Sequence, residues 1–289
     1  MKKASLILLA MLLLVALLAG CDGDAPQPNQ PTETDYAVSV KTASGLPLGK
    51  IRIQVYEDAT KVELVAMGMT DDNGNYSFTA PTGDGYVAVL EKVPESLEVG
   101  ADYPLAGEMT TISLSPKTLN DALMDSAKLA VGDMMMDFSV TDCDGTEYKL
   151  SELLNVKKAV VLNFWYLNCE PCKMEFPFVQ EAYEACGEDV AFLGMNCVDG
   201  TDEKISAFKA ENNLTFSLSA CDARWQTVMN LTAYPTTLII DRYGYIVASH
   251  RGMFTESAEL ISALEYISTD GYQHEIFDSI GEVPSANGV

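Results

Sequence analysis

Two cysteines spaced for redox chemistry, Cys169 and Cys172, are the most reactive pattern in this chain of 289 residues. They follow an apolar run over residues 159–165 and precede an amphipathic stretch, which predicts a strand that ends where a helix begins. A helix N-terminus stabilises negative charge, so the first thiol ionises readily and becomes a nucleophile. The second thiol, one turn on, can resolve a mixed disulfide. The pair therefore predicts thiol–disulfide exchange, a reaction for which we expect no cofactor.

The residues around the pair have predictable roles. We expect Cys169 to attack from a partly exposed position at or just before the helix start, and Cys172 to lie deeper and resolve. Pro171 suits the first helical turn, where its missing N–H costs nothing. Glu170 places a carboxylate beside the sulfurs, where it can raise the thiol pKa and move protons. An equally weighted alternative is a solvated Glu170 side chain at the helix start.

The first twenty residues have the pattern of an export signal. Lys2 and Lys3 precede an apolar stretch over residues 5–18, so residues 1–20 are expected to be a signal peptide. The segment Leu18-Ala19-Gly20-Cys21 resembles the bacterial lipobox, and this resemblance implies that Cys21 is lipidated. The expected location is therefore extracytoplasmic, on the bacterial cell membrane. The alternative is an ordinary signal peptide followed by a chance cysteine.

The chain is strongly acidic, with a formal net charge of −24 at pH 7. Such a surface repels phosphate backbones, which excludes nucleic acid as an expected partner. It also repels anionic lipid headgroups, which makes a lipid anchor more useful, although the preferred interpretation of the charge is a solvated surface.

Composition divides the remaining N-terminal part into a linker and a domain. Residues 21–35 are polar and predict a flexible linker. Residues 36–116 contain short alternating runs separated by turns, which predicts an all-β sandwich. The turn Gly45-Leu46-Pro47-Leu48-Gly49 and the later stretch over residues 70–78 resemble carboxypeptidase-regulatory-like and collagen-adhesin B-type domains. That resemblance implies a spacer, with ligand binding as the alternative.

The pattern changes in the second half of the chain. Residues 117–130 predict a linker with one or two helical turns. Residues 131–268 predict an α/β domain, because apolar strands alternate with amphipathic helices. Residues 269–289 carry little pattern and predict a partly disordered tail.

The segment over residues 163–177, which includes Cys-Glu-Pro-Cys, resembles the active-site region of thioredoxin-fold proteins. It is most similar to membrane-anchored oxidoreductases of the TlpA/ResA type, which share the Val131-Gly132-Asp133 entry. The resemblance implies an α/β thioredoxin fold, with a central mixed sheet flanked by helices. It also implies that Pro235 is cis and lies beside the cysteine pair. By the same analogy, the substrates are disulfides of exported proteins and the reductant is a membrane electron carrier.

Three positions depart from that family pattern, and one of them, Met136 in place of a proline, has little expected effect. Asn168 stands where relatives usually have Trp, which removes an apolar surface beside the sulfurs. Asn163 stands where cytoplasmic thioredoxins have a buried acid, which shifts the expected proton-transfer role to Glu170.

The other cysteines receive separate predictions. Cys186 shares a helical face with Cys172 and is expected to be a buried core thiol. Cys143 falls in a predicted turn and is a candidate exposed thiol. Cys197 and Cys221 each end a predicted strand, and whether they form a disulfide depends on geometry.

Two further functions compete with disulfide reduction through the Cys-Glu-Pro-Cys dithiol. One is a thiol peroxidase, although the sequence offers no Pro-x-x-x-Thr-x-x-Cys environment to activate a peroxidatic sulfur. The other is a surface-binding lipoprotein in which the β-sandwich binds a ligand.

Overall fold

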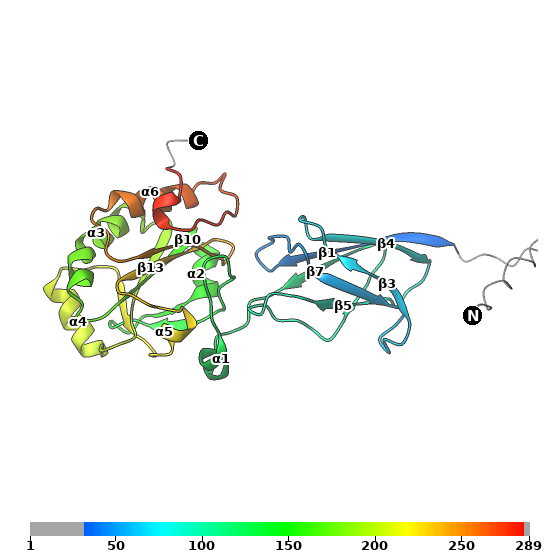
Figure 1. Ribbon diagram of the computed structural model, residues 1–289, viewed down its shortest axis with the longest axis horizontal. Helices are drawn as coiled ribbons and strands as arrows, with labels where there is room; N and C mark the ends of the chain where they lie inside the picture. Colours follow the sequence, from blue (N-terminus) through cyan, green and yellow to red (C-terminus); the bar gives the residue numbers. More distant parts are fainter. Residues whose placement is uncertain (1–31, 286–289) are drawn as a thin grey trace, which may run out of the picture.

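The computed structural model describes residues 32–285 and divides them into two units that lie end to end (Figure 1). The predicted signal peptide, Cys21 and most of the predicted linker 21–35 lie outside the described residues. Among the helices of residues 32–285, none is both long and apolar enough to cross a membrane.

The N-terminal unit consists of strands in two sheets. The strands are β1 (Glu33–Thr42), β2 (Arg52–Tyr56), β3 (Leu64–Met69), β4 (Asn75–Pro81), β5 (Val87–Glu91), β6 (Tyr103–Pro104) and β7 (Met109–Leu114). One sheet has the order β4-β1-β7 and the other β3-β2-β5-β6. Side chains from both sheets, including Val38, Ile53 and Ile112, form one buried cluster. The alternating apolar residues thus face a shared interior.

The predicted end of the first linker is wrong, because β1 already begins at Glu33. Glu33 pairs with Pro81 on β4, and the hydroxyl groups of Thr34 and Thr82 lie 2.7 Å apart. This part of the strand is polar, so its extended form depends on pairing with β4, which apolar alternation does not reveal.

The second predicted linker contains the expected helical turns in α1 (Asp121–Ser126). The Asn120 side chain caps this helix by accepting a hydrogen bond from Leu123 N at 3.1 Å. Met124 and Leu129 are buried against the C-terminal unit. The segment is therefore a packed part of that unit, whereas its polar composition predicted a linker.

A five-stranded sheet forms the centre of the C-terminal unit, in the order β12-β11-β10-β13-β14. Its strands are β10 (Ala159–Trp165), β11 (Val190–Asn196), β12 (Ser217–Ala220), β13 (Thr236–Asp241) and β14 (Ile246–Arg251), and a separate hairpin is formed by β8 (Ser139–Thr141) and β9 (Glu147–Lys149). β10 runs parallel to β11 and antiparallel to β13. This mixed sheet confirms the arrangement predicted for the α/β domain.

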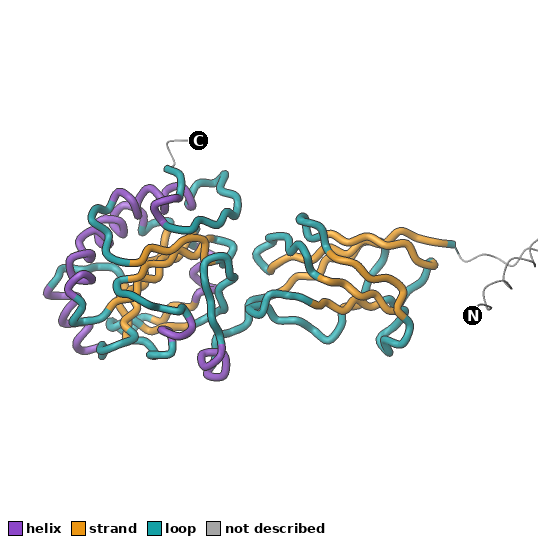
Figure 2. Tube along the Cα trace, in the orientation of Figure 1, coloured by secondary structure: helices purple, strands orange, loops and turns teal. Residues whose placement is uncertain are grey.

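Helices cover both faces of this sheet (Figure 2). They are α2 (Leu150–Val156), α3 (Glu170–Cys186), α4 (Asp202–Glu211), α5 (Trp225–Val228) and α6 (Ala258–Ile267). Val161 on β10 packs in one cluster with residues of α3, α4 and α6, and its neighbour Leu162 packs in a second cluster with α1 and α5. Both faces of β10 are covered, which explains why the strand is apolar throughout.

The predicted disordered tail is wrong for residues 269–285. This segment ends in a short helix, η1 (Ile280–Glu282), and buries Tyr272, Ile280 and Val283. Phe277 N donates to Val247 O of β14 at 2.8 Å, so the segment lies along the outer strand of the sheet. Its few apolar residues are too irregularly spaced to give a periodic sequence signal.

Candidate active site

The Cys169–Cys172 pair lies where β10 leads into α3. Cys169 is the N-cap of α3, with extended backbone angles, and its Sγ accepts a hydrogen bond from Cys172 N at 3.1 Å. Pro171 occupies the first turn of the helix, as predicted. The strand delivers the first sulfur directly to the unpaired N–H groups of the helix N-terminus.

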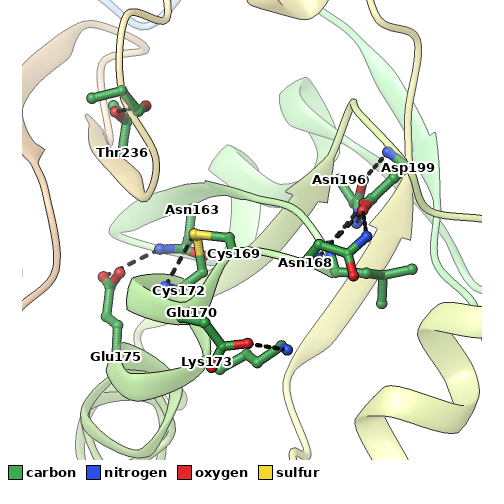
Figure 3. Close-up of a disulfide and its surroundings, with 12 residues drawn as sticks. Asn163, Asn168, Cys169, Glu170, Cys172, Lys173, Glu175, Asn196, Asp199 and Thr236 are labelled. Carbon is green, nitrogen blue, oxygen red and sulfur yellow. Dashed lines mark hydrogen bonds and ion pairs between the residues drawn. A yellow bond between two sulfur atoms is a disulfide. The ribbon is translucent and has the colours of Figure 1, made fainter.

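The two sulfurs form a disulfide with an S–S distance of 2.02 Å and a Cα–Cα distance of 5.2 Å (Figure 3). Both cysteines are only 1% exposed. The prediction that Cys169 is partly exposed is therefore wrong for this oxidised form. Side chains of Tyr166, Leu167 and Tyr234 pack against the core cluster that contains the pair.

Glu170 points into solvent, with 76% of its side chain exposed. Its carboxylate pairs with Lys173 Nζ at 2.7 Å (Figure 3). Two alternatives were predicted for Glu170, a carboxylate that acts on the sulfurs and a solvated side chain at the helix start. Its exposed position fits the solvated side chain.

The buried carboxyl group of the site belongs to Glu175, a residue that the sequence interpretation did not identify. Glu175 is 1% exposed and accepts a hydrogen bond from Asn163 Nδ2 at 3.3 Å. Asn163 also donates to Thr237 Oγ1 at 3.0 Å. Burial raises the pKa of Glu175 to about 8, and a hydrogen bond from Thr237 only partly opposes this. A signal was present, because Glu175 follows Cys172 by three residues and so shares its inward face.

A carboxylate also holds the turn in front of Cys169. Asp199 accepts from Leu167 N at 2.8 Å, from Asn168 N at 3.3 Å and from Asn168 Nδ2 at 2.9 Å (Figure 3). Asn196 Nδ2 donates to the same carboxylate at 3.3 Å. The unusual Asn168 therefore ties the turn to the end of β11 by polar contacts, where Trp would offer an apolar ring.

Pro235 has the predicted cis peptide bond, with Tyr234. It directly precedes β13, whose first residue Thr236 lies opposite Phe164 on β10. This register brings the proline to the end of β10, from which the cysteine turn departs. Gly252 N donates to the Pro235 carbonyl at 2.9 Å and holds the loop against β14.

The remaining cysteines in the described residues carry free thiols. Cys186 is buried as predicted, and burial raises its pKa to about 11. Cys143, the candidate exposed thiol, is half-buried. Cys197 and Cys221 are close together but not bonded, with their Sγ atoms 3.4 Å apart.

Comparison with known proteins identifies relatives of the C-terminal unit. Residues 131–249 match the AhpC/TSA family. The chain is 32% identical over 135 residues to the thiol-disulfide oxidoreductase ResA of Geobacillus kaustophilus, covering 46% of this chain and 75% of that protein. It is 28% identical over 127 residues to the thioredoxin-like protein YneN of Bacillus subtilis, covering 43% of this chain and 74% of that one.

A search of solved structures also finds a putative protein disulfide isomerase from Bacteroides thetaiotaomicron. It is 27% identical, with a TM-score of 0.44, and the match covers 49% of this chain and 91% of the other. The extent and identity of the ResA match show the family of this chain, and the cysteine pair at the N-terminus of a helix agrees with it. The chain belongs to the ResA-like family of thiol-disulfide oxidoreductases.

Proposed function

We propose that the protein reduces disulfides in exported proteins through the Cys169–Cys172 dithiol. The observation that carries this proposal is the position of Cys169 as the N-cap of α3. In the reduced protein, the helix N–H groups would stabilise a Cys169 thiolate. That thiolate attacks a substrate disulfide and releases one substrate thiol. Cys172 then attacks Cys169, which releases the second substrate thiol and restores the disulfide.

Glu175 is the group we propose for proton transfer in the second step. Cys172 must lose its proton before it attacks, and Glu175 lies one turn further along the same helix. With a pKa of about 8, Glu175 is mostly protonated at neutral pH, so its ionised fraction is the form that accepts the Cys172 proton, and this fraction grows as the pH approaches 8. Glu170, which the sequence suggested for this role, is exposed and paired with Lys173.

Substrate binding would use the loop that contains Pro235. Proline has no backbone N–H, and its loop lies at the end of β10 from which the cysteine turn departs, so we propose that an extended segment of the client pairs with the backbone there. The Cys-Glu-Pro-Cys segment and Pro235 are therefore the proposed site residues, with no cofactor.

The proposed location is extracytoplasmic, with attachment to the membrane through a lipid on Cys21. The support is the sequence of residues 1–21, which lies outside the described structure. The two sheets of the N-terminal unit share one buried cluster, which supports a β-sandwich. In this arrangement we propose that the sandwich is a spacer between the membrane and the C-terminal unit. A membrane electron carrier would re-reduce the Cys169–Cys172 pair.

Insulin reduction tests the roles of the two cysteines. Cys169→Ser is expected to abolish activity, whereas Cys172→Ser is expected to accumulate mixed disulfides through Cys169. Cys186→Ser, which removes a buried thiol of the same helix, is the matched control and should retain activity. Full activity of Cys169→Ser would contradict the proposal.

The direction of electron flow is tested by the reduction potential of the Cys169–Cys172 couple in defined thiol buffers. A potential near that of thioredoxin, about −270 mV, supports a reductant. A potential near that of DsbA, about −120 mV, would instead indicate a protein that installs disulfides.

A further inference from the structure

The ends of β11 and β12 bring a second pair of thiols together. Cys197 directly follows β11, and Cys221 directly follows β12. The two strands are parallel, with Asn196 opposite Ala220, and Cys221 N donates to Asn196 O at 2.9 Å. The two cysteines are thus the next residues beyond the last paired row. Neighbouring strands lie about 4.8 Å apart, which falls within the Cα separation that a disulfide requires.

The sulfurs of this pair already face each other. The Cys221 thiol donates a hydrogen bond to Cys197 Sγ at 3.4 Å. Cys197 is 3% exposed, whereas Cys221 is half-buried. To form a bond, the two Sγ atoms must approach from 3.4 Å to about 2.05 Å, and the pairing of β11 with β12 holds the backbone next to both residues. The structure gives neither Cys143 nor Cys186 a sulfur partner among residues 32–285.

We propose that Cys197 and Cys221 form a second, reversible disulfide, made by exchange with a small-molecule or peptide disulfide. The more accessible Cys221 loses its proton and attacks that disulfide, which forms a mixed disulfide and expels one thiolate. Cys197 loses its proton and attacks Cys221 Sγ, which closes the Cys197–Cys221 bond and expels the second thiolate. The two protons pass to the two leaving thiolates. The cysteine pair is oxidised by two electrons, and the small-molecule or peptide disulfide is reduced to two thiols.

The pair is separate from the Cys169–Cys172 disulfide but lies next to the loop of the cis proline. Tyr234, which precedes Pro235, packs with Cys197 and Cys221 in the second core cluster. Its hydroxyl group is buried without a hydrogen-bond partner, and burial followed by the two nearby thiols raises its pKa to about 12. A Cys197–Cys221 bond would thus link the ends of β11 and β12, next to the loop that contains Tyr234 and Pro235.

The same environment sets the order of oxidation. The hydrogen bond to Cys197, followed by burial, holds the pKa of Cys221 well above its ordinary value. Its thiolate is therefore scarce at neutral pH, whereas Cys169 caps a helix that favours its thiolate. The second pair is expected to oxidise after the Cys169–Cys172 pair and more slowly.

Peptide mapping tests the proposal on the full chain. The reduced protein is incubated with glutathione buffers of increasing glutathione disulfide content, quenched in acid, denatured, alkylated and digested with trypsin. Cys221 then lies in the peptide 210–224, and Cys197 shares the peptide 174–204 with Cys186. We expect these two peptides to become linked, and the linkage to persist in Cys186→Ala and to disappear in Cys197→Ala.

Three results would overturn the inference. The first is complete alkylation of both peptides in the most oxidising buffer after the exchange has reached equilibrium. The second is a Cys221 that carries glutathione alone, and the third is a linkage that is lost in Cys186→Ala. Because alkylation follows denaturation, burial cannot protect a free thiol in this assay. The measurement on the wild-type protein does not depend on the folding of any variant.

Discussion

At the scale of single residues, the most unusual group in the site is Glu175. It is buried, and its hydrogen-bond partners are Asn163 and Thr237, with no cation among them. A carboxyl group in this setting is stable when protonated and costs free energy when ionised. The fold therefore favours a proton on Glu175, one helical turn after Cys172, that the same side chain would lose in the unfolded chain near pH 4.5.

This burial predicts a pH dependence of stability. The pKa of Glu175 is raised from 4.5 to about 8 on folding, so the folded state binds more protons between these values. The stabilising contribution of protonated Glu175 is complete below pH 4.5. As the pH rises from 4.5 to about 8, the free energy of unfolding should therefore fall by about 4 kcal/mol. Urea unfolding at a series of pH values should show this decline in the wild-type protein. Glu175→Gln, which is always neutral, should lack it.

Glu170→Gln is the matched control for this pH series. Glu170→Gln removes an exposed carboxylate from the same helix and should leave the pH dependence of the wild-type protein unchanged. If the unfolding free energies of the wild-type protein and Glu175→Gln changed in parallel from pH 5 to pH 8, Glu175 would not hold the proton.

A second residue-scale prediction concerns Asp199, which accepts hydrogen bonds from the backbone of Leu167 and Asn168. Asp199→Ala leaves these donors without their partner, which should cost about 1–3 kcal/mol of stability and slow insulin reduction. Asp199→Asn keeps one acceptor oxygen and should lie between the wild-type protein and the alanine variant. Removal of an exposed charge in Glu188→Ala is the control, and an equal effect of the two alanine variants would contradict this role.

Sequence reasoning identified the cysteine pair that forms the disulfide but not the buried carboxyl group of the same helix. A cysteine pair between an apolar strand and an amphipathic helix is a local pattern, so Cys169 and Cys172 were predictable. The partner of Asn163 was not, because it depends on which side chain of α3 faces β10 in the folded protein. Glu170 adjoins the sulfurs in sequence, yet the helix turns it to solvent.

At the scale of elements, the described part of the C-terminal tail is a structural component of the redox domain. Its residues cover β14 and place Tyr272 and His274 around the buried Asp241. Tyr272 OH donates to the Asp241 carboxylate at 3.2 Å, and His274 Nδ1 lies 2.8 Å from it. The segment thereby partners a carboxylate that would otherwise be costly to bury.

Two isoleucines in this tail provide a test of its packing. Ile280 is 1% exposed and Ile276 is 44% exposed. Ile280→Ala should therefore destabilise the domain by about 2–4 kcal/mol, and Ile276→Ala by less than about 1 kcal/mol. Tryptophan fluorescence is a suitable probe, because the only tryptophans of the chain, Trp165 and Trp225, lie in the C-terminal unit. Equal, small effects would mean that the tail does not pack on the domain.

The elements that sequence analysis misjudged share a physical cause. The start of β1, the segment with α1 and the tail after α6 are all ordered by contacts with distant parts of the chain. Their own residues are polar or irregular, so they give no periodic signal. The strands and helices of the central sheet bury a continuous apolar face, and their order was therefore predictable.

At the scale of the whole molecule, net charge is expected to govern the encounter with substrates. The chain carries −24 at pH 7, whereas the exposed Glu170 carboxylate at the site is paired with Lys173. A potential of one sign attracts ligands of the opposite charge and raises their association rate. Salt weakens this effect, because the screening length falls from about 30 Å at 0.01 M to about 3 Å at 1 M.

The protein should therefore reduce cationic clients faster than anionic ones. We expect a disulfide peptide flanked by lysines to react about tenfold faster at low ionic strength than the same peptide flanked by glutamates. The ratio should approach one in 1 M salt, while a peptide flanked by serines should change little. The three rates can be compared as second-order rate constants for the reduced protein. A ratio that did not change with salt would mean that contacts at the Pro235 loop, rather than the field of the molecule, select the client.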